Sequence, residues 1–553
     1  MTPAARDRAA VRRVLVRLLL GGLAAAVAAL PFLAAWQHRA DRLAVEDQAR
    51  PPAAPPAAGA PAARDLPRGT GPVVLAYHDV RPDGERPYTV TPTAFEGHLA
   101  ALRSAGYRTL STAEFVRHLR GEPVPGRTVY LTFDDGAQGL WRHADRSLAR
   151  YGMRAAVYLI TGQVGERHGY YLSWEEVRRM ASSGRWDFQS HTDDLHRHLP
   201  LDAAGARRGP ALTERLWLPA ESRRETSAEY RARVAADLDR SIGAITAHGL
   251  PRPLLFAYPF SESHGSGPAG AGDLSGLLRQ RFTAALTNHG GPHPPGAGAR
   301  AAAEGTVQRL EITTGTTAAD LMAGLAERTP RRPGDAPRPL ADPGGWDFPG
   351  APAGTGVGAF TGAGPYPAGR EHLSAEYRPS ATADWTGYAA DADVRALHAD
   401  TNGVSVTVRV HGTRPVAVAL SRAGLRVTEG TGSGRRTVAR ARLEPAARHT
   451  LRIVVSARST DVYVDGRRRA RVAVPADAAA GARGGIALGV RNDGAPHWPA
   501  FRTLTIAAAD GTWGPGGTAD ARPGPVRTTG QGATGGPAPT TGPAEAARER
   551  TSR

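Results

Sequence analysis

Two adjacent carboxylates, Asp134 and Asp135, stand at the end of a short apolar run and are the first candidates for chemistry in this chain. The run, residues 129–133, is rich in β-branched and aromatic side chains, which predicts a buried strand. Neighbouring side chains of an extended chain point in opposite directions, so the two acids are expected to do different jobs. Burying a carboxylate without a partner is costly, so the pair indicates a bound metal or a transferred proton. The structural alternative is a helix cap at Asp134 and a turn at Asp135.

Two histidines, His191 and His196, lie five residues apart in the segment His-Thr-Asp-Asp-Leu-His. This is not the spacing of a metal pair on one helix face, but it suits a strand end followed by a turn. With Asp135 they form a set of two histidines and one carboxylate that leaves coordination positions open. Such a set is typical of a catalytic metal, either zinc or another divalent ion such as iron, cobalt or nickel. His198 is an alternative to His196, and each histidine alone could be structural.

A metal held in this way would acidify a bound water and polarise a carbonyl oxygen. Asp134 is then the candidate base that takes the proton of that water. A leaving amine needs a proton in return, and His78 is the candidate acid. His78 directly follows another apolar run, residues 73–77, so an ordinary strand-end histidine is the alternative.

Apolar runs alternate with helical patterns through this part of the chain, which predicts parallel β/α units. Signals for helix starts occur at Thr91, Ser111 and Ser173. The predicted strands are residues 73–77, 129–133, 155–160, 186–190, 254–258, 282–287 and 310–313. In a β/α barrel the carboxyl ends of all strands meet on one face, where the chemistry is done. That architecture would bring together His78, the Asp134–Asp135 pair, His191 and Tyr258-Pro259.

Composition excludes several classes of site. The 553 residues contain no cysteine, so disulfides and thiolate metal sites are excluded. All 69 residues counted as Lys or Arg are arginine, which excludes a Schiff-base lysine and a phosphate-loop lysine. The net charge of +17 favours an anionic neighbour. No nucleic-acid-binding motif accompanies it, so a surface polymer is expected rather than nucleic acid.

The N-terminal part predicts a membrane anchor. Residues 1–17 are basic and are expected to be cytoplasmic, whereas residues 18–36 carry no charge. Nineteen helical residues span roughly 28 Å, close to the hydrocarbon core of a bilayer. Basic residues before the span place the N-terminus inside and the catalytic domain outside the cell membrane. The alternative is a cleaved signal peptide, which would leave a secreted protein. Residues 37–72 form a Pro/Ala-rich linker.

The rest of the chain divides into segments that differ in residue composition and hydrophobic pattern. Residues 73–325 carry the β/α pattern, and residues 326–373 are Pro/Gly-rich and read as a linker. Residues 374–508 contain short alternating runs separated by turns, which predicts a β-sandwich. Residues 509–553 are rich in Gly, Pro and Thr, which predicts disorder.

Leu-Thr-Phe-Asp-Asp-Gly at 131–136, together with Ser-His-Thr at 190–192 and His196, resembles the polysaccharide deacetylases (carbohydrate esterase family 4, NodB homology). The resemblance covers residues 73–325. Its details fit the branch that deacetylates poly-β-1,6-N-acetylglucosamine. These details are Tyr77-His78-Asp79-Val80, Gly106-Tyr107, the segment around Trp174, Gly184-Arg-Trp186 and Phe256-Ala-Tyr-Pro259.

This resemblance implies a deformed (β/α) barrel and a role for each candidate residue. It implies Asp134 as the base and His78 as the acid. The metal ligands that it implies are Asp135, His191 and His196. The substrate-binding residues that it implies are Tyr258, Pro259, Phe260 and Trp174, with the backbone N–H of Phe260 contributing to an oxyanion hole.

Three features depart from the family pattern. The third motif reads Phe-Ala-Tyr-Pro-Phe-Ser, without the arginine that the family often has there. No clear late Leu-x-x-His motif is present, and residues 202–225 form an Arg-rich insert. Residues 374–508 resemble a concanavalin/laminin-G-like jelly roll that could bind carbohydrate. Candidate contacts there are Trp385, Tyr388, Trp498 and Arg491, with core packing as the alternative for the two tryptophans.

The expected function is that of a metal-dependent hydrolase. It would remove N-acetyl groups from a β-linked N-acetylglucosamine polysaccharide outside the membrane, so an acetylated glycan polymer is the expected partner. One alternative is a peptidoglycan N-deacetylase. Another is a non-catalytic surface protein that binds glycans through the sandwich.

Overall fold

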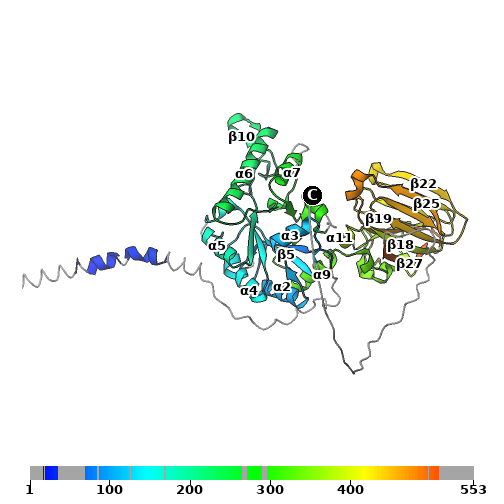
Figure 1. Ribbon diagram of the computed structural model, residues 1–553, viewed down its shortest axis with the longest axis horizontal. Helices are drawn as coiled ribbons and strands as arrows, with labels where there is room; N and C mark the ends of the chain where they lie inside the picture. Colours follow the sequence, from blue (N-terminus) through cyan, green and yellow to red (C-terminus); the bar gives the residue numbers. More distant parts are fainter. Residues whose placement is uncertain are drawn as a thin grey trace, which may run out of the picture. The chain divides into compact units, whose positions relative to one another are not determined.

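The computed structural model describes residues 16–17, 19–25, 27–34, 69–83, 86–124, 126–166, 170–264, 271–288, 296–495 and 497–509. These residues contain a β/α barrel and, after it in the sequence, a β-sandwich (Figure 1). The predicted anchor, residues 18–36, lies only partly within the described residues, and no helix among those is long and apolar enough to cross a membrane. The segments predicted as a linker at 37–72 and as a tail at 509–553 lie almost entirely outside them.

The barrel is built on a nine-stranded sheet in which every strand pairing is parallel, as the alternating pattern predicts. The strand order is β14-β13-β12-β7-β6-β5-β1-β15, and β4 pairs with β5. The strands are β1 (Val73–Tyr77), β4 (Arg108–Thr109), β5 (Thr128–Phe133), β6 (Ala155–Leu159), β7 (Trp186–Ser190), β12 (Leu255–Ala257), β13 (Ala284–Thr287), β14 (Val307–Gln308) and β15 (Leu310–Glu311).

The two edges of this sheet are joined by the segment 307–311. β14 pairs with β13 at one edge, and β15 pairs with β1 at the other. Only Arg309 separates the two strands, and its backbone N–H donates to the Thr287 carbonyl at 3.0 Å. Residues 307–311 therefore bring the sheet close to a closed barrel, with Arg309 at the junction.

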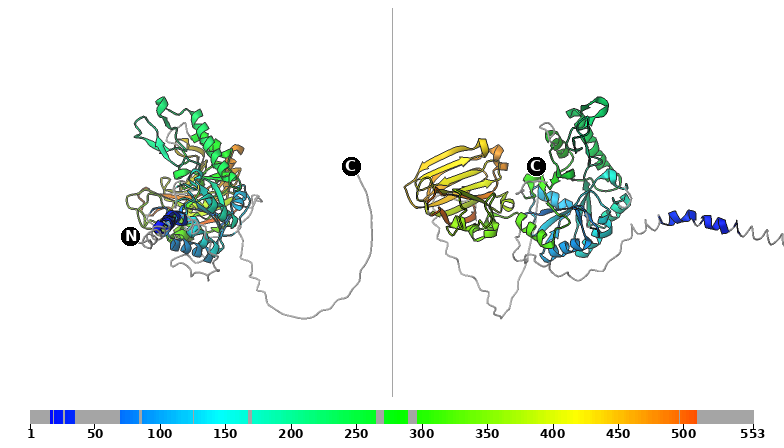
Figure 2. Two further views of the ribbon diagram at one scale, coloured as in Figure 1. Left: turned by 90° about the vertical axis from the view of Figure 1, so that its left-hand side faces the viewer. Right: turned by 180° about the vertical axis from the view of Figure 1, so that it is seen from behind.

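Helices cover the outside of the sheet (Figure 2). They are α2 (Pro92–Ser104), α3 (Thr112–Leu119), α4 (Asp145–Tyr151), α5 (Trp174–Ser182), α6 (Ser227–Ala247), α7 (Ala271–Arg279), α8 (Ala299–Glu304) and α9 (Ala318–Arg328). The predicted helix starts are confirmed, because the side chains of Thr91, Ser111 and Ser173 each accept a hydrogen bond from the amide three residues on. Ser111 and Ser173 form complete capping boxes.

The barrel core explains why its strands are so apolar. Every residue of β1, β5 and β6 is buried, since helices or the barrel interior cover both faces of these strands. Inside the core, Tyr77 packs edge-on against Phe95 and also contacts Phe133, with ring centroids 5.4 and 5.2 Å apart. This aromatic packing lies directly below the strand ends that carry His78 and Asp134 and fixes them rigidly.

The insert at 202–225 is ordered by two short hairpins. They are formed by β8 (His198–Pro200) with β9 (Arg208–Pro210) and by β10 (Trp217–Leu218) with β11 (Arg223–Arg224). Leu212 and Leu216 belong to a hydrophobic cluster with Tyr230 and Val234 of α6. The insert is therefore packed against the first half of α6, and β8 begins two residues after His196.

The sandwich consists of two antiparallel sheets that share one hydrophobic core. The seven-stranded sheet has the order β16 (Trp346–Asp347), β17 (His372–Tyr377), β26 (Gly485–Arg491), β19 (Gly403–Val410), β20 (Val416–Leu420), β21 (Gly424–Glu429) and β22 (Arg436–Arg442). The five-stranded sheet has the order β25 (Arg467–Ala473), β24 (Ser459–Val464), β23 (Arg448–Val455), β18 (Tyr388–Arg395) and β27 (Ala500–Ala508). Burial alternates along most of these strands, which is the pattern that predicted them.

Two expectations for this part differ from the structure. The segment 326–373 is not only a linker, because β16 joins the seven-stranded sheet and Trp346 and Phe360 are buried in the sandwich core. The sequence pattern did not reveal these two apolar residues, because the segment around them is rich in Pro and Gly. Tyr388, considered as a glycan contact, is 0% exposed, and core packing, the alternative for the two tryptophans, is confirmed by Trp385 and Trp498, which are 2% and 9% exposed.

Candidate metal centre and active site

The structure places Asp135, His191 and His196 together, as their spacing predicts. The Asp135 Oδ1 atom lies 3.6 Å from His191 Nε2 and 3.5 Å from His196 Nε2. One potential ligand atom from each residue lies within 4.8 Å of the other two. Asp135 follows β5 and His191 follows β7, so the barrel topology makes neighbours of residues that are far apart in the sequence.

Local backbone geometry aims these side chains. Asp135 has φ 70° and Thr192 has φ 76°, values in the left-handed region that side chains with a Cβ rarely adopt. Each residue lies within two positions of the end of its strand, so the chain turns sharply there. Strain of this kind persists only where the surrounding structure enforces it, and here the turns aim the carboxylate and the imidazoles at one point.

The three residues fit a divalent metal ion. The Asp135 Oδ1 atom is buried and has no hydrogen-bond partner among the described residues, which is costly unless a cation is bound. His191 Nδ1 lies 2.8 Å from the Ala257 carbonyl and donates to it, which leaves Nε2 free as a ligand atom. Burial lowers the pKa of His191 to about 4, so the ring is neutral at pH 7, the state that binds metals.

Asp134 makes a different set of contacts, as expected for the neighbour of a ligand. Both of its carboxylate oxygens accept hydrogen bonds from the guanidinium of Arg309, at 2.7 Å each. Both side chains are almost fully buried. Burial alone would raise the pKa of Asp134, but the charge and hydrogen bonds of Arg309, together with the nearby histidines His191 and His78, more than offset it and hold this pKa well below its usual range. Asp134 is therefore an ionised carboxylate held in one orientation.

Arg309 is the residue of this site that sequence reasoning missed. Its guanidinium also donates to Asn288 Oδ1 at 2.8 Å and to Thr132 Oγ1 at 3.3 Å. It supplies a cation next to Asp134 although the third motif lacks an arginine. A single arginine between two short apolar segments gives no local signal of burial. Only the position of residues 307–311 in the closing sheet could have revealed it.

His78 lies at the end of β1, next to the strand that carries Asp134. Its Nδ1 atom is buried and has no hydrogen-bond partner within the described part of the chain. The ring of Tyr88 covers His78, with the two centroids 4.7 Å apart. The imidazole therefore packs against Tyr88 and has one buried nitrogen without a partner among the described residues.

The segment after β12 lies next to the cluster of Asp135, His191 and His196, which is called the metal group below. The Phe260 ring contacts His196 and His198, with centroids 4.4 and 4.3 Å away. Phe260 has φ 57° and belongs to a turn that starts at the buried Pro259. The Tyr258 hydroxyl points away, because it donates to the Gly305 carbonyl at 3.0 Å. Phe260 is therefore the residue of this predicted trio whose side chain contacts a metal ligand.

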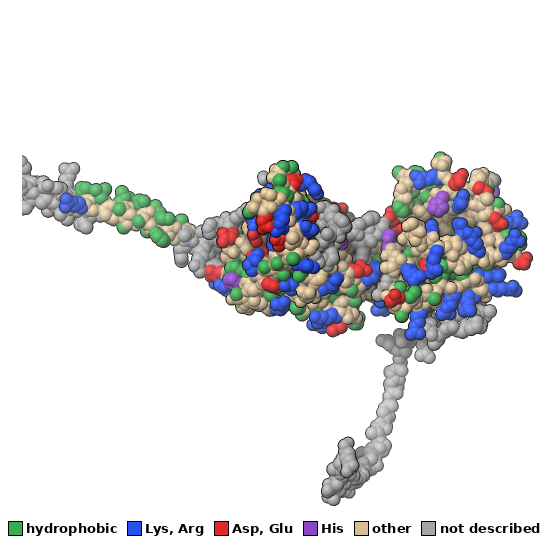
Figure 3. Space-filling view, turned by 90° about the horizontal axis from the view of Figure 1, so that it is seen from above, with side chains coloured by type: hydrophobic (Ala, Val, Ile, Leu, Met, Phe, Trp, Pro, Cys, Tyr) green, Lys and Arg blue, Asp and Glu red, His purple; other side chains and the backbone are tan. Residues whose placement is uncertain are grey.

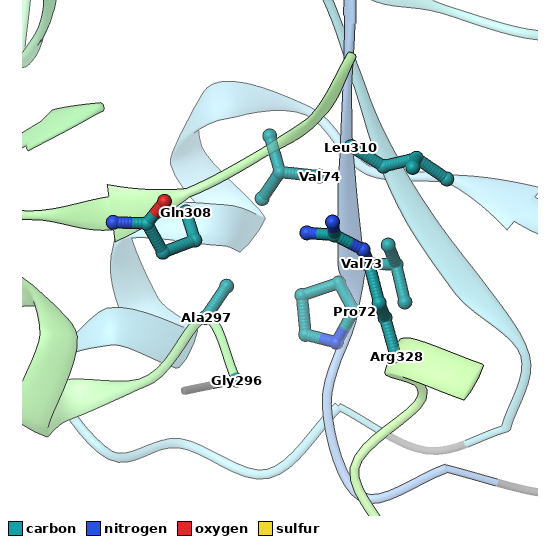
Figure 4. A pocket seen from close by; sticks show the side chains of 8 residues that line it. All are labelled: Pro72, Val73, Val74, Gly296, Ala297, Gln308, Leu310 and Arg328. Atoms are coloured by element: carbon teal, nitrogen blue, oxygen red, sulfur yellow. The ribbon is translucent and has the colours of Figure 1, made fainter. Parts of the chain in front are cut away.

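Trp174 lies in a different environment from the other predicted site residues. Its ring stacks on His248 just beyond the end of α6, with centroids 3.8 Å apart, and it packs against the barrel core. A substrate contact by Trp174 stays a prediction. The pocket in Figure 4 is also separate from the metal group, since residues at the start of β1, such as Pro72 and Val73, line it together with Ala297 and Arg328.

Comparisons with known proteins found relatives of part of this chain. Residues 121–266 match the family model described as "Polysaccharide deacetylase". A poly-β-1,6-N-acetyl-D-glucosamine N-deacetylase of Escherichia coli is 28% identical over 210 residues, which are 35% of this chain and 31% of that protein. One of Staphylococcus aureus is 33% identical over 112 residues, which are 20% of this chain and 39% of that protein. The chain thus spans about a third of the length of these curated relatives.

Among solved structures, IcaB from Ammonifex degensii is 27% identical, with a TM-score of 0.35, and the match covers 47% of this chain and 98% of that one. The deacetylase domain of BpsB from Bordetella bronchiseptica is 26% identical, with a TM-score of 0.36, over 44% of this chain and 95% of that one. The matched family segment contains Asp134, Asp135, His191 and His196, whereas His78 and Arg309 lie outside it.

Proposed function

Because this chain carries a polysaccharide deacetylase domain, we propose that it removes N-acetyl groups from a β-linked N-acetylglucosamine polysaccharide with the help of a divalent metal. The observation that carries this proposal is the cluster of Asp135 and two histidines. The buried Asp135 Oδ1 has no hydrogen-bond partner among the described residues, and a second, ionised carboxylate, Asp134, lies next to it. The named relatives act on a poly-β-1,6-linked polymer, which makes that linkage the first substrate to test.

Asp135, His191 and His196 would hold the metal, and zinc is the ion that we propose. When bound there, the metal acidifies a water molecule and polarises the acetyl carbonyl. The donor set of two imidazoles and one carboxylate is common for catalytic zinc and leaves room for water and substrate. The hydrogen bond from His191 to Ala257 supports this role, because it fixes the ring orientation and the tautomer.

Asp134 would take a proton from the attacking water. Arg309 keeps this carboxylate ionised and prevents it from rotating, so the base is ready at neutral pH. His78 would return a proton to the amine nitrogen as the C–N bond breaks. The two residues follow neighbouring strands, β5 and β1, which supports their action at one reaction centre.

Phe260 and the turn after Pro259 would border the acetyl group. The contact between the Phe260 ring and His196 supports this placement, because a methyl group needs an apolar wall next to the metal. The backbone N–H of Phe260 would stabilise the developing oxyanion.

The test is acetate release by the purified full chain from a panel of substrates. The panel contains oligomers of β-1,6-linked and β-1,4-linked N-acetylglucosamine and peptidoglycan fragments. We expect release from the β-1,6-linked oligomers, loss of activity with a chelator and recovery with zinc. Preferred release from peptidoglycan would instead identify a peptidoglycan N-deacetylase, and binding of the polymer without any release would identify a non-catalytic protein.

We also propose that this reaction takes place outside the cell membrane and that residues 18–36 anchor the chain. The uncharged run and the arginines before it support this arrangement. Protease treatment of intact cells is the test. Cleavage of the barrel from outside, with the protein in the membrane fraction, is expected, and recovery of the mature chain in the medium would show signal-peptide cleavage instead.

A further inference from the structure

Two arginines face each other on the outer surface of the seven-stranded sheet. Arg426 of β21 lies directly opposite Arg440 of β22 in the antiparallel register, and both side chains are exposed. The neighbours of Arg426, Leu425 and Val427, are buried, and those of Arg440, Ala439 and Ala441, pack against the core, so the two arginines point to solvent. No salt bridge or hydrogen bond joins either guanidinium to an acidic side chain within the part of the chain that the structure describes.

Like charges directly opposite each other destabilise a sheet. On the five-stranded sheet, where Arg395 lies directly opposite Arg448, neighbouring acidic side chains offset that cost. There, Arg448 and Arg502 share Asp393, at 2.7 and 3.2 Å, and Arg452 pairs with Asp391 at 3.1 Å. The Arg426–Arg440 pair thus lacks the acidic partners that this domain supplies on its other face.

Protection of a sheet edge does not explain the pair. Charged side chains on an edge strand prevent pairing with other chains, which accounts for Arg440 on β22. β21 is not an edge strand, because it lies between β20 and β22. Arg426 is therefore not needed for that purpose, and edge protection leaves the pair unexplained.

The row of residues that continues from the pair across the sheet is uncharged. The row that starts at Arg440 and Arg426 continues through Ala419, Ser405, Gly489 and Ser374 on four further strands. Gly489 is buried next to His372, whereas Ala419, Ser405 and Ser374 reach the surface, where the serine hydroxyls can bond to sugar hydroxyls. Figure 3 shows arginines scattered over the sandwich, but this row carries charge only at one end.

We propose that this face of the sandwich binds an acidic polysaccharide whose carboxylates are separated by neutral sugars, with one carboxylate held between Arg426 and Arg440. Guanidinium groups bind carboxylates through two parallel hydrogen bonds, and two of them match a single acidic group well. A uniformly charged polymer such as DNA would need a continuous basic track, which the neutral row does not offer. The location of the pair on a chain with a polysaccharide deacetylase domain favours a glycan as the occupant.

The test is binding of gellan oligosaccharides, in which neutral sugars separate the glucuronates, to the purified full chain by isothermal titration calorimetry. The R426A/R440A double variant is expected to bind at least about tenfold more weakly, since it loses two charge-assisted contacts. The matched control is R448A/R502A, which removes two arginines from the opposite face and should bind within about twofold of the wild type.

Further measurements make the outcome decisive. Wild-type binding should weaken as salt is raised, and neutral dextran should not bind. R426A/R440A should keep or raise the melting temperature, because a repulsive pair is removed. Absence of gellan binding, an equal loss in both double variants, or tighter binding of duplex DNA through the same pair would each overturn the proposal. Because binding is measured without acetate release, failure of the proposed deacetylase activity would leave this result intact.

Discussion

Arg309 holds both carboxylate oxygens of Asp134 at 2.7 Å across 175 residues of sequence. The ion pair is almost fully buried, and it lies where the segment 307–311 joins the two edges of the barrel sheet. One contact therefore connects closure of the fold with the ionisation of the proposed base. It also separates the two neighbouring acids, because Asp134 is paired with a guanidinium and Asp135 faces two histidines.

Replacing Arg309 with methionine should lower kcat about 10²- to 10⁴-fold, the usual contribution of a general base. Without the guanidinium, burial raises the pKa of Asp134, so the acidic limb of the kcat/KM profile should move to higher pH. Bound metal should stay at the wild-type level. The kcat of R309K should lie between those of the wild type and R309M, because lysine keeps the charge but not the two parallel hydrogen bonds. An unchanged pH profile in R309M would show that Arg309 is only structural.

Replacing His196 with alanine should reduce the metal content of the purified protein and abolish acetate release, because the site then keeps only two ligands. Elemental analysis is the measurement. H198A is the matched control, since His198 is exposed and contacts Phe260 rather than the metal group. Metal loss in H198A with retention in H196A would reverse the assignment of the second histidine ligand.

H78N should lower kcat by about 10²-fold or more, since the leaving amine then lacks its proton donor. The metal content should not change, because His78 is outside the group of potential ligands. Y88F is a suitable control, since it keeps the ring that packs on His78. If H78N releases acetate at the wild-type rate, another residue must be the acid.

The stability of the barrel should depend on pH through His98. This buried ring lies 3.1 Å from the Tyr77 hydroxyl and 2.9 Å from the Thr316 carbonyl, and burial lowers its pKa below 6.5. The unfolded state therefore binds the proton more readily, so the free energy of unfolding should fall as the pH drops below about 6.5. The slope for one proton is at most about 1.4 kcal/mol per pH unit.

Chemical denaturation of the wild type and H98Q between pH 5 and 7.5, in a chelator, measures this contribution. H98Q should show a shallower slope than the wild type. A residual slope is expected in the variant, because burial also lowers the pKa of His191. Parallel slopes would mean that His98 is protonated to the same extent in the folded and unfolded states.

Much of the candidate site followed from local patterns. Three of the apolar runs that were read as core strands end in polar residues that the structure places at the barrel mouth, namely His78, Asp134 and His191. The ligand trio could be predicted because strand ends in a parallel barrel necessarily meet. The β-sandwich was equally visible, because alternation of buried and exposed residues is a property of each strand alone.

The sequence by itself therefore determined the barrel, the sandwich and the residues that surround the metal group. Only the tertiary structure decided which residue pairs with Asp134, that Trp346 belongs to the sandwich core, and that Arg426 faces Arg440. The physical reason is that burial and cross-strand register depend on distant segments. The local sequence around an arginine does not reveal whether the side chain faces solvent, another arginine or a buried carboxylate. Only the packing of remote strands distinguishes these cases.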